Sequence, residues 1–380
     1  MARDVSRGGP LKIDRQSFPR TRAVLAHGAG GDGPWSPDVH ARATELGVDA
    51  LLRHVCSQQR WGSSREGSPR HLQAALLLRR RAAREEVRAA LRRWGVHYAI
   101  LKGEALGVVL YGVPHARRTS DVDVLVRRED LPRAGRALRA LGWNPAYDAA
   151  PRTWRSDEWG FARARDGLVV ELHWALADPM VASPEAAELL VRSVLAQVGS
   201  ERIPVLSPQD TILNLGYHFH HHSGFFKGLV DLAGAVDRFG EEAALGALRR
   251  AAALGAWGVI AWGLGCVEQI SGEGCGVGGR AGWRVRAAVE LVVRRSRGVM
   301  SGAEELEDAS AMGFKTRGVA PWEWMAMRMV CMGLLDDPWD RAKGVLEPAA
   351  AAMVPGVVER LRRGGRLAPW SRPTSGTKPP

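Results

Sequence analysis

Hydrophobic residues recur along this chain with two different periods, one typical of helices and one typical of strands. From His71 to Trp94 the apolar positions fall close to helical spacing, and Gly95 follows as a helix stop. A second amphipathic helix is predicted between Asp130, as its N-cap, and Gly142. We expect the first of these helices to pack on a sheet.

Strand-like runs lie between and after these helices. The short runs Tyr98 to Leu101 and Asp121 to Val126 are predicted strands. Two further runs, Trp159 to Arg163 and Leu168 to Trp174, flank an Asp-Gly pair, which is a good hairpin signal. Beyond Pro208 the pattern is mostly helical. This order of elements predicts an α+β fold with a mainly α-helical C-terminal domain.

The chain of 380 residues is long enough for two domains, and its composition divides it into four parts. Residues 1–70 alternate Gly, Pro, Ser and Arg with short helical patches, so we expect this region to be partly disordered. Residues 71–204 hold the predicted strands, and residues 205–363 form the helical domain. The Pro-, Ser- and Gly-containing tail, residues 364–380, is predicted to be disordered.

The net charge of +12 is the unusual feature of the composition. A basic surface can attract nucleic acid, nucleotides or an anionic membrane. However, only six of the 53 basic residues are lysine, and Ala and Gly are abundant too. A codon bias toward GC-rich DNA would give the same balance, so the charge is weak support for an RNA partner.

Nothing in the sequence indicates a membrane protein or a secreted one, and we expect a cytoplasmic location. The longest uncharged run, Ala251 to Val267, is rich in Gly and Ala and a little short for a span, which favours a buried helix or helix pair. The first residues lack an apolar signal core. The four cysteines form no C-x-x-C pair and no zinc-ligand spacing.

Two carboxylates stand on one face of the strand that begins at Asp121. Side chains alternate along a strand, so Asp121 and Asp123 project to the same side. Such a pair repels itself unless a cation with a preference for oxygen ligands lies between the two groups. The pattern therefore predicts a site for Mg²⁺, with Mn²⁺ as the alternative ion.

The motifs around this strand are those of a known family. The segments LKGEAL, LYG and R-x-x-S-D-V-D-V-L-V, followed by a helix that ends in Leu-Gly, resemble the uncharacterised nucleotidyltransferase family of the DNA polymerase beta superfamily, over about Leu72 to Gly240. The resemblance implies a small mixed sheet with helices. It also implies transfer of a nucleotidyl group from a nucleoside triphosphate to an acceptor hydroxyl, with release of pyrophosphate.

The resemblance also implies roles for individual residues. Asp121 and Asp123 would hold the metal ion, and Glu171, on the strand of the E-L-H-W segment, would be the third catalytic carboxylate. An isolated Glu at that place would otherwise be an edge-strand residue facing water. The residues that would contact the nucleotide are Lys102, Gly103, Arg118 and Ser120.

Several residues near the predicted site allow more than one interpretation. His173 can order Glu171 or the acceptor. His218 and His222 lie one helical turn apart and could bind zinc together, although no Glu follows in an H-E-x-x-H arrangement. By the resemblance, His218, His222, Lys227 and Asp231 instead line the cleft that faces the catalytic core. A surface bridge between Lys227 and Asp231 is the plain alternative.

Two functions remain open on the sequence. The first is an active enzyme, whose acceptor is a small molecule, an RNA or a peptide. The second is a binding module for a nucleotide, an RNA or a protein that has lost turnover, which is favoured because Glu104 follows Gly103 where the superfamily usually has Ser. The three retained carboxylates favour the enzyme. The helical C-terminal half favours a small-molecule acceptor, whereas the basic charge favours RNA.

Overall fold

The computed structural model describes residues 3–4, 18–30, 37–46, 48–55, 69–117, 121–146, 158–163, 168–177, 181–222, 225–297 and 334. The predicted disordered tail, residues 364–380, and nearly all of the predicted helical region beyond residue 297 lie outside this range. The described part confirms a mixed α+β architecture.

The described strands form one mixed sheet in the order β1-β7-β8-β2-β3-β6-β5-β4. The strands are β1 Arg3–Asp4, β2 Tyr98–Ile100, β3 Asp121–Val126, β4 Asn144–Pro145, β5 Glu158–Arg163, β6 Leu168–His173, β7 Val194–Val198 and β8 Glu201–Val205. Within the sheet β3 is antiparallel to β2 and parallel to β6. The antiparallel pairing of β5 with β6 confirms the predicted hairpin.

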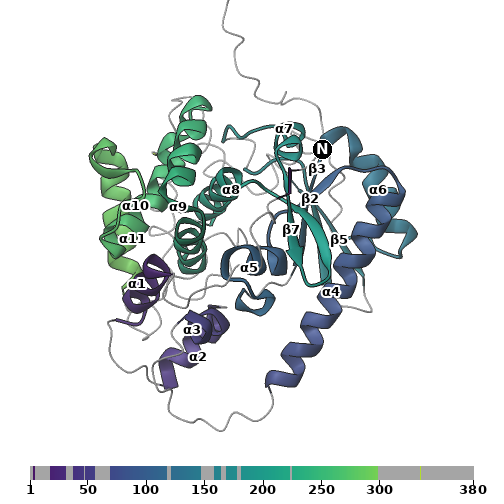
Figure 1. Cartoon of the computed structure of the whole chain (residues 1–380), viewed down its shortest axis with the longest axis horizontal. Coiled ribbons are helices and arrows are strands. Elements are labelled where there is room, and N and C mark those ends of the chain that lie inside the picture. Colours follow the sequence, from purple (N-terminus) through teal and green to yellow (C-terminus); the bar gives the residue numbers. More distant parts are fainter. Residues whose placement is uncertain are drawn as a thin grey trace, which may run out of the picture.

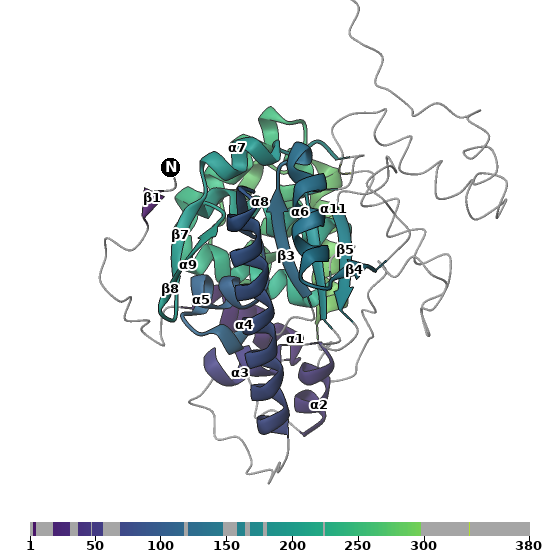
Figure 2. The ribbon, with the colours of Figure 1, turned by 90° about the vertical axis from the view of Figure 1, so that its right-hand side faces the viewer.

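Helices cover both faces of this sheet. They are α1 Pro19–Gly28, α2 Pro37–Glu45, α3 Asp49–Val55, α4 Pro69–Arg93, α5 Gly103–Tyr111, α6 Leu131–Ala140, α7 Ala186–Val191, α8 Pro208–His221, α9 Phe226–Ala253, α10 Trp257–Ser271 and α11 Trp283–Ser296, with short 3₁₀ turns η2 Pro114–Ala116, η3 Arg128–Asp130 and η4 Gly278–Arg280. Figure 1 shows α1 and α8 to α11 on one side of the sheet, with α5 between them and the strands. In the view of Figure 2, α4 and α6 lie in front of the strands.

The alternation of side chains along β3 divides the apolar interior into two clusters. Val122, Val124 and Val126 pack with Val87 and Leu91 of α4 in the cluster under α4 and α6. The next cluster, which contains Leu125 of β3, is formed mainly by the other helices. The odd-numbered positions of β3 therefore face the helical half of the chain.

Asp130 occupies the predicted N-cap position of α6, but its side chain makes no capping hydrogen bond to that helix. Arg127 Nε donates to Asp130 Oδ2 at 2.8 Å instead, which holds the carboxylate against the residues before it. The uncharged run from Ala251 to Val267 is a helix pair as expected, since α9 ends at Ala253 and α10 begins at Trp257. None of the described helices combines the length and apolar character that crossing a membrane requires.

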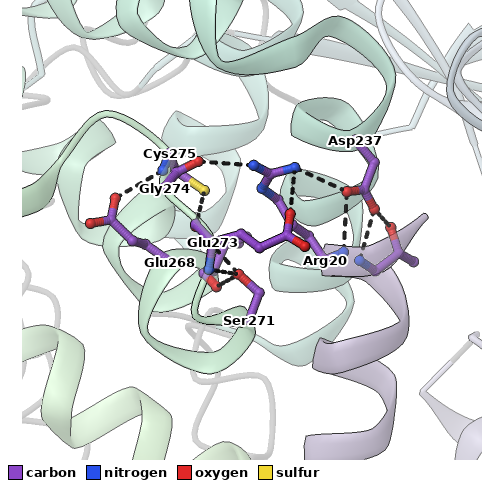
Figure 3. A network of polar contacts seen from close by, with 9 residues as sticks. Arg20, Asp237, Glu268, Ser271, Glu273, Gly274 and Cys275 are labelled. Carbon is purple, nitrogen blue, oxygen red and sulfur yellow. Dashed lines mark hydrogen bonds and ion pairs between the residues drawn. The ribbon is translucent and has the colours of Figure 1, made fainter. Parts of the chain in front are cut away.

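Helix α1 is joined to the helical layer by a polar network (Figure 3). The backbone N–H and the hydroxyl of Thr21 both donate to Asp237 Oδ2 on α9, at 2.9 and 2.7 Å. The guanidinium of Arg20 reaches Glu273 at 3.1 Å and donates to the carbonyl of Gly274 at 3.0 Å. Part of the first 70 residues is thereby fixed to segments more than 200 residues away in the sequence.

The contact between α5 and α9 depends on a glycine. A Cβ added to Gly234 would lie 2.3 Å from the hydroxyl of Tyr111, which is completely buried. We expect Gly234→Ala to lower the free energy of unfolding by about 1–3 kcal/mol, because the ring has no room to move. Gly279→Ala, at a position with nothing within 4 Å, is the control. Equal values for the two variants in urea unfolding would contradict this packing.

Candidate active site

The candidate site lies on the face of the sheet that is turned toward the helical half of the chain. Asp121 and Asp123 come from β3, and Glu171 and His173 come from its parallel neighbour β6. The register places Asp123 beside Glu171. Since alternate residues of a strand share a face, these four residues lie on the side of Leu125. The sheet thus brings together two pairs of residues that are about fifty positions apart in the sequence.

Asp123 is the centre of this group and is 1% exposed. Its Oδ1 lies 3.0 Å from Lys102 Nζ and 3.2 Å from His173 Nε2. Its Oδ2 is buried and has no hydrogen-bond partner in the described part of the chain. A buried acceptor without a partner is costly, so a further positive group at Oδ2 would be stabilising.

The residues present fit a divalent cation. Ligand atoms of Asp123, Glu171 and His173 all lie within 4.8 Å of one another. Asp121 is outside this group of three but stands on the same face of β3 and is half-buried. Carboxylate oxygens are the ligands that Mg²⁺ and Mn²⁺ prefer in proteins. The unpartnered oxygen of Asp123 is the atom that such an ion would satisfy.

A buried ion pair connects the region before β3 to the helical half. Arg117, just after η2, donates from Nε to Asp231 Oδ2 of α9 at 3.0 Å. The two side chains are 5% and 3% exposed. Lys227, one turn earlier on α9, is influenced by the charges of Arg117, Asp121 and Asp231. Residues of α9 therefore stand close to the acidic face of the sheet.

The family to which the chain belongs follows from a direct comparison. A model of a family described as an uncharacterised nucleotidyltransferase matches residues 37–271, which is more than half of the sequence. The chain belongs to this nucleotidyltransferase family. The match runs from α2 to α10 and so includes the whole acidic cluster and both partners of the Arg117–Asp231 pair.

One solved structure that the comparison matches to this chain is the solution structure of an antibiotic-resistance factor, ANT(2'')-Ia. The sequences are 16% identical, the similarity covers 45% of this chain and 91% of that one, and the TM-score is 0.32. No functionally curated protein matches the chain.

In this member of the family, two positive groups flank the carboxylate of Asp123. Burial favours the neutral form of Asp123, but Lys102 and His173 outweigh this effect and hold the pKa of the carboxyl well below its usual range. Burial likewise opposes the charge of His173, yet hydrogen bonds to Asp123 and Glu171 raise its pKa to about 10. At neutral pH the carboxylate of Asp123 is therefore ionised between two cations.

On the helical side, burial and neighbouring positive charges lower the pKa of two basic side chains. Burial and the nearby Arg117 lower the pKa of Lys227 to about 8. Burial and the charge of Lys102 hold the pKa of His218 well below its ordinary value. The ring of His218 is 4.3 Å from that of His222 and 5.1 Å from that of Phe225, measured between centroids. These two histidines therefore form part of an aromatic cluster in which His218 is neutral at pH 7.

The raised pKa of His173 predicts a pH dependence of stability in metal-free buffer. A histidine whose folded pKa of about 10 exceeds its ordinary value of 6.5 stabilises the fold fully below pH 6.5. That contribution is lost as the pH rises toward 10. We expect urea unfolding with a chelator present to show a loss of stability between pH 6.5 and 10 that His173→Gln reduces. The same slope in both proteins would contradict this assignment.

The structure brings most of the predicted site residues into one region. Lys102, Asp121, Asp123, Glu171 and His173 lie together on the sheet, and the charges of Lys102 and Arg117 act on His218 and Lys227. Their roles stay predictions. Gly103 begins α5 next to Lys102 with a positive φ of 73°. Arg118 and Ser120 lie outside the described residues.

One of the alternative interpretations is wrong, and a second finds no support among the described residues. Asp231 is buried against Arg117, so it is not part of a surface bridge. Among the side chains that the structure describes, the group able to offer three metal ligands is Asp123, Glu171 and His173, and it includes neither His218 nor His222. The zinc interpretation therefore finds no third ligand there.

Arg84 and Arg117 were not among the predicted site residues. Adjacent arginines in a loop cannot be distinguished by pattern, and Arg118 was predicted in place of its neighbour Arg117. Arg84 stands on the same helical stripe as the buried residues Val87 and Leu91. An arginine on the apolar stripe of a helix is a signal of a buried ion pair.

Proposed function

We propose that this nucleotidyltransferase uses Mg²⁺ to transfer a nucleoside monophosphate from a nucleoside triphosphate to an acceptor hydroxyl. The observation that carries the proposal is the buried, ionised carboxylate of Asp123, with one oxygen on Lys102 and the other without a partner. Most buried polar atoms in folded proteins have a hydrogen-bond partner, so an unpartnered buried oxygen calls for an explanation. The free oxygen and the neighbouring Glu171 support a role in binding a cation.

Asp121, Asp123 and Glu171 would hold the ion, or two ions. When bound, Mg²⁺ supplies charge neutralisation for the attacking and the leaving oxygen. Lys102 stabilises negative charge on the triphosphate, since its ammonium group already lies at the acidic cluster. Glu171, whose side chain is 17% exposed, accepts the proton of the acceptor hydroxyl, and His173 at 3.6 Å orients its carboxylate.

The proposed transfer forms one bond and breaks one bond at the α-phosphorus. The acceptor oxygen forms a bond to the α-phosphorus as its proton passes to Glu171, and the bond from the α-phosphorus to the oxygen that bridges to the β-phosphate breaks. Pyrophosphate leaves with that oxygen. Little covalent help is needed in such a transfer, so positioning and charge neutralisation account for most of the rate.

A second function is a binding module that holds a nucleotide without turnover. Glu104 favours it, because a carboxylate occupies the position after Gly103 and is buried there. The acidic cluster favours the enzyme, because three carboxylates on one face are costly to keep without a cation.

The test is release of labelled pyrophosphate from each of the four nucleoside triphosphates with Mg²⁺ or Mn²⁺. Total RNA, a metabolite extract and a protein extract serve as separate acceptor pools. We expect release with one pool, which identifies the acceptor class. If Mg-nucleotide binds to the folded protein and no pool gives pyrophosphate, the binding module is the correct function.

A further inference from the structure

Three aromatic side chains form a cluster where α8 ends and α9 begins. His218 lies in the last turn of α8, His222 is the C-cap of that helix, and Phe225 is the N-cap of α9. The ring centroids of the two histidines lie 4.3 Å apart, and that of Phe225 lies 5.1 Å from His218 and 4.9 Å from His222. Each ring therefore lies next to the other two, and the three are called the ring cluster below.

The ring cluster keeps part of its aromatic surface exposed. His218, His222 and Phe225 are all half-buried, whereas the adjacent rings of Phe219 and Phe226 are 0% and 1% exposed. The buried rings belong to the apolar core that joins α8, α9 and α10. The exposed faces of the ring cluster are available to a planar ligand, which would gain by removing them from water.

The orientation of one ring is fixed by a glycine. A Cβ added to Gly228 would lie 2.4 Å from Cε1 of Phe225, so this ring lies against the backbone of the first turn of α9. A side chain that is already held in one position loses little conformational entropy when a ligand binds. The ring cluster is thus preorganised to present a surface.

The ring cluster borders the acidic cluster from the helical side. Lys102, which lies 3.0 Å from Asp123, is close enough for its charge to act on His218. The charge of Arg117 acts on His218 too, and its partner Asp231 lies in the second turn of α9. A molecule held on the rings would therefore lie beside the proposed catalytic carboxylates.

The chain around the ring cluster contains basic residues and no acidic ones. Between Asp210 and Asp231 the sequence has four histidines and Lys227 but neither Asp nor Glu. Asp231 itself is paired with Arg117. A ligand with several positive charges would be repelled here, whereas a neutral or anionic one would not.

We propose that the ring cluster binds a planar aromatic group of the acceptor, and that the acceptor is a small aromatic alcohol or phenol without excess positive charge. The proposal rests on the proposed function and deepens it, because it names the acceptor class. Stacking on the exposed faces buries apolar surface and adds favourable ring geometry. Since the rings border the acidic face, an acceptor held there can present its hydroxyl to the carboxylates.

The probe is 2-naphthylmethanol, an uncharged planar alcohol, and decahydro-2-naphthylmethanol is its saturated counterpart. Both are titrated by ligand-observed NMR into the full chain with Mg²⁺ and a non-hydrolysable nucleoside triphosphate. We expect Phe225→Leu to weaken binding of the aromatic alcohol by about threefold to tenfold and that of the saturated alcohol by less than about twofold. An analogue of the aromatic alcohol with two ammonium groups should bind the wild type about tenfold more weakly.

Two further variants make the test specific. Gly228→Ala keeps all three rings but displaces that of Phe225, so it should also weaken binding of the aromatic alcohol. Phe239→Leu is the matched control, because Phe239 is on the same helix, is half-buried as well and is not part of the ring cluster. Its affinity should stay within about twofold of the wild type.

Several results would overturn the acceptor site. They are equal binding of the aromatic and the saturated alcohol, no binding of either by the wild type, wild-type affinity in both Phe225→Leu and Gly228→Ala, or equal losses in the Phe225 and Phe239 variants. The nucleobase is the other planar group in the reaction. If Phe225→Leu weakens binding of the nucleoside triphosphate and leaves that of inorganic tripolyphosphate unchanged, the rings bind the base and the acceptor assignment is wrong.

The outcomes also separate this inference from the proposed function. If any of these results is found while pyrophosphate is released with an acceptor pool, the ring cluster loses its assignment and the transferase stands. Selective loss of the aromatic alcohol in Phe225→Leu, without turnover in any pool, supports the ring cluster as a site for an aromatic ligand and favours the binding module.

Discussion

Replacement of Asp123 by Asn is expected to lower the rate of pyrophosphate release by about a thousandfold. The change keeps the shape of the side chain and removes its charge. Lys102 and His173 both converge on this carboxylate, and its second oxygen is the unpartnered one. Without the negative charge, the two cations repel a metal ion from the site. The measurement is single-turnover release of labelled pyrophosphate with Mg²⁺.

Asp210→Asn is the matched control. Asp210 is also completely buried, and its carboxylate accepts from Arg192 Nε at 3.0 Å and from the hydroxyl of Ser207 at 2.6 Å. Both variants leave partly exposed arginine or lysine partners without full compensation, so both should lose stability. Turnover should fall steeply only in the Asp123 variant. An Asp123→Asn protein that is folded and keeps a tenth of the wild-type rate would exclude Asp123 as an essential ligand.

The shared face of Asp121 and Asp123 could be predicted because it depends only on the alternation of neighbouring residues along one strand. Alternation along Asp121 to Val126 predicted which residues share a face, and the hairpin signal predicted that Glu171 lies on a strand paired with β5. The role of Glu171 as the third carboxylate came from the family resemblance. The direct pairing of β3 with β6 was not predicted, since strand order does not follow from the alternation of side chains. The structure adds the register, which sets Asp123 beside Glu171.

The buried charges could not be predicted in the same way. Arg117 and Asp231 are 114 positions apart, and Thr21 and Asp237 are 216 apart. A charged residue is expected at the surface when only the sequence is known. Its burial becomes favourable only when an oppositely charged partner lies next to it in the folded protein. Helix α1 illustrates the consequence. It has a weak amphipathic pattern, and contacts to α9 and α10 fix it in place.

Removal of one partner of the Arg117–Asp231 pair should cost about 3–5 kcal/mol of unfolding free energy. The pair is almost fully buried, and burial works against the charge of Arg117, which Asp231 and the more distant Asp123 and Asp121 offset by raising its pKa. Asp231→Ala therefore leaves a guanidinium in the interior without its main partner. The double variant Arg117→Met/Asp231→Leu removes both charges and should recover most of the loss. Urea unfolding of the three variants at pH 7 measures these differences.

Turnover in the same variants separates two roles of this pair. If the pair only joins the loop before β3 to α9, the double variant should regain both stability and the rate of pyrophosphate release. If Arg117 also contributes charge at the site, the double variant should be stable and slow. A cost below about 1 kcal/mol for Asp231→Ala would contradict the first prediction. Such a small cost would mean that Arg117 turns to Asp121 and Asp123 when Asp231 is removed. The guanidinium would then compete with the metal ion for these carboxylates, so the Asp231→Ala variant would react more slowly.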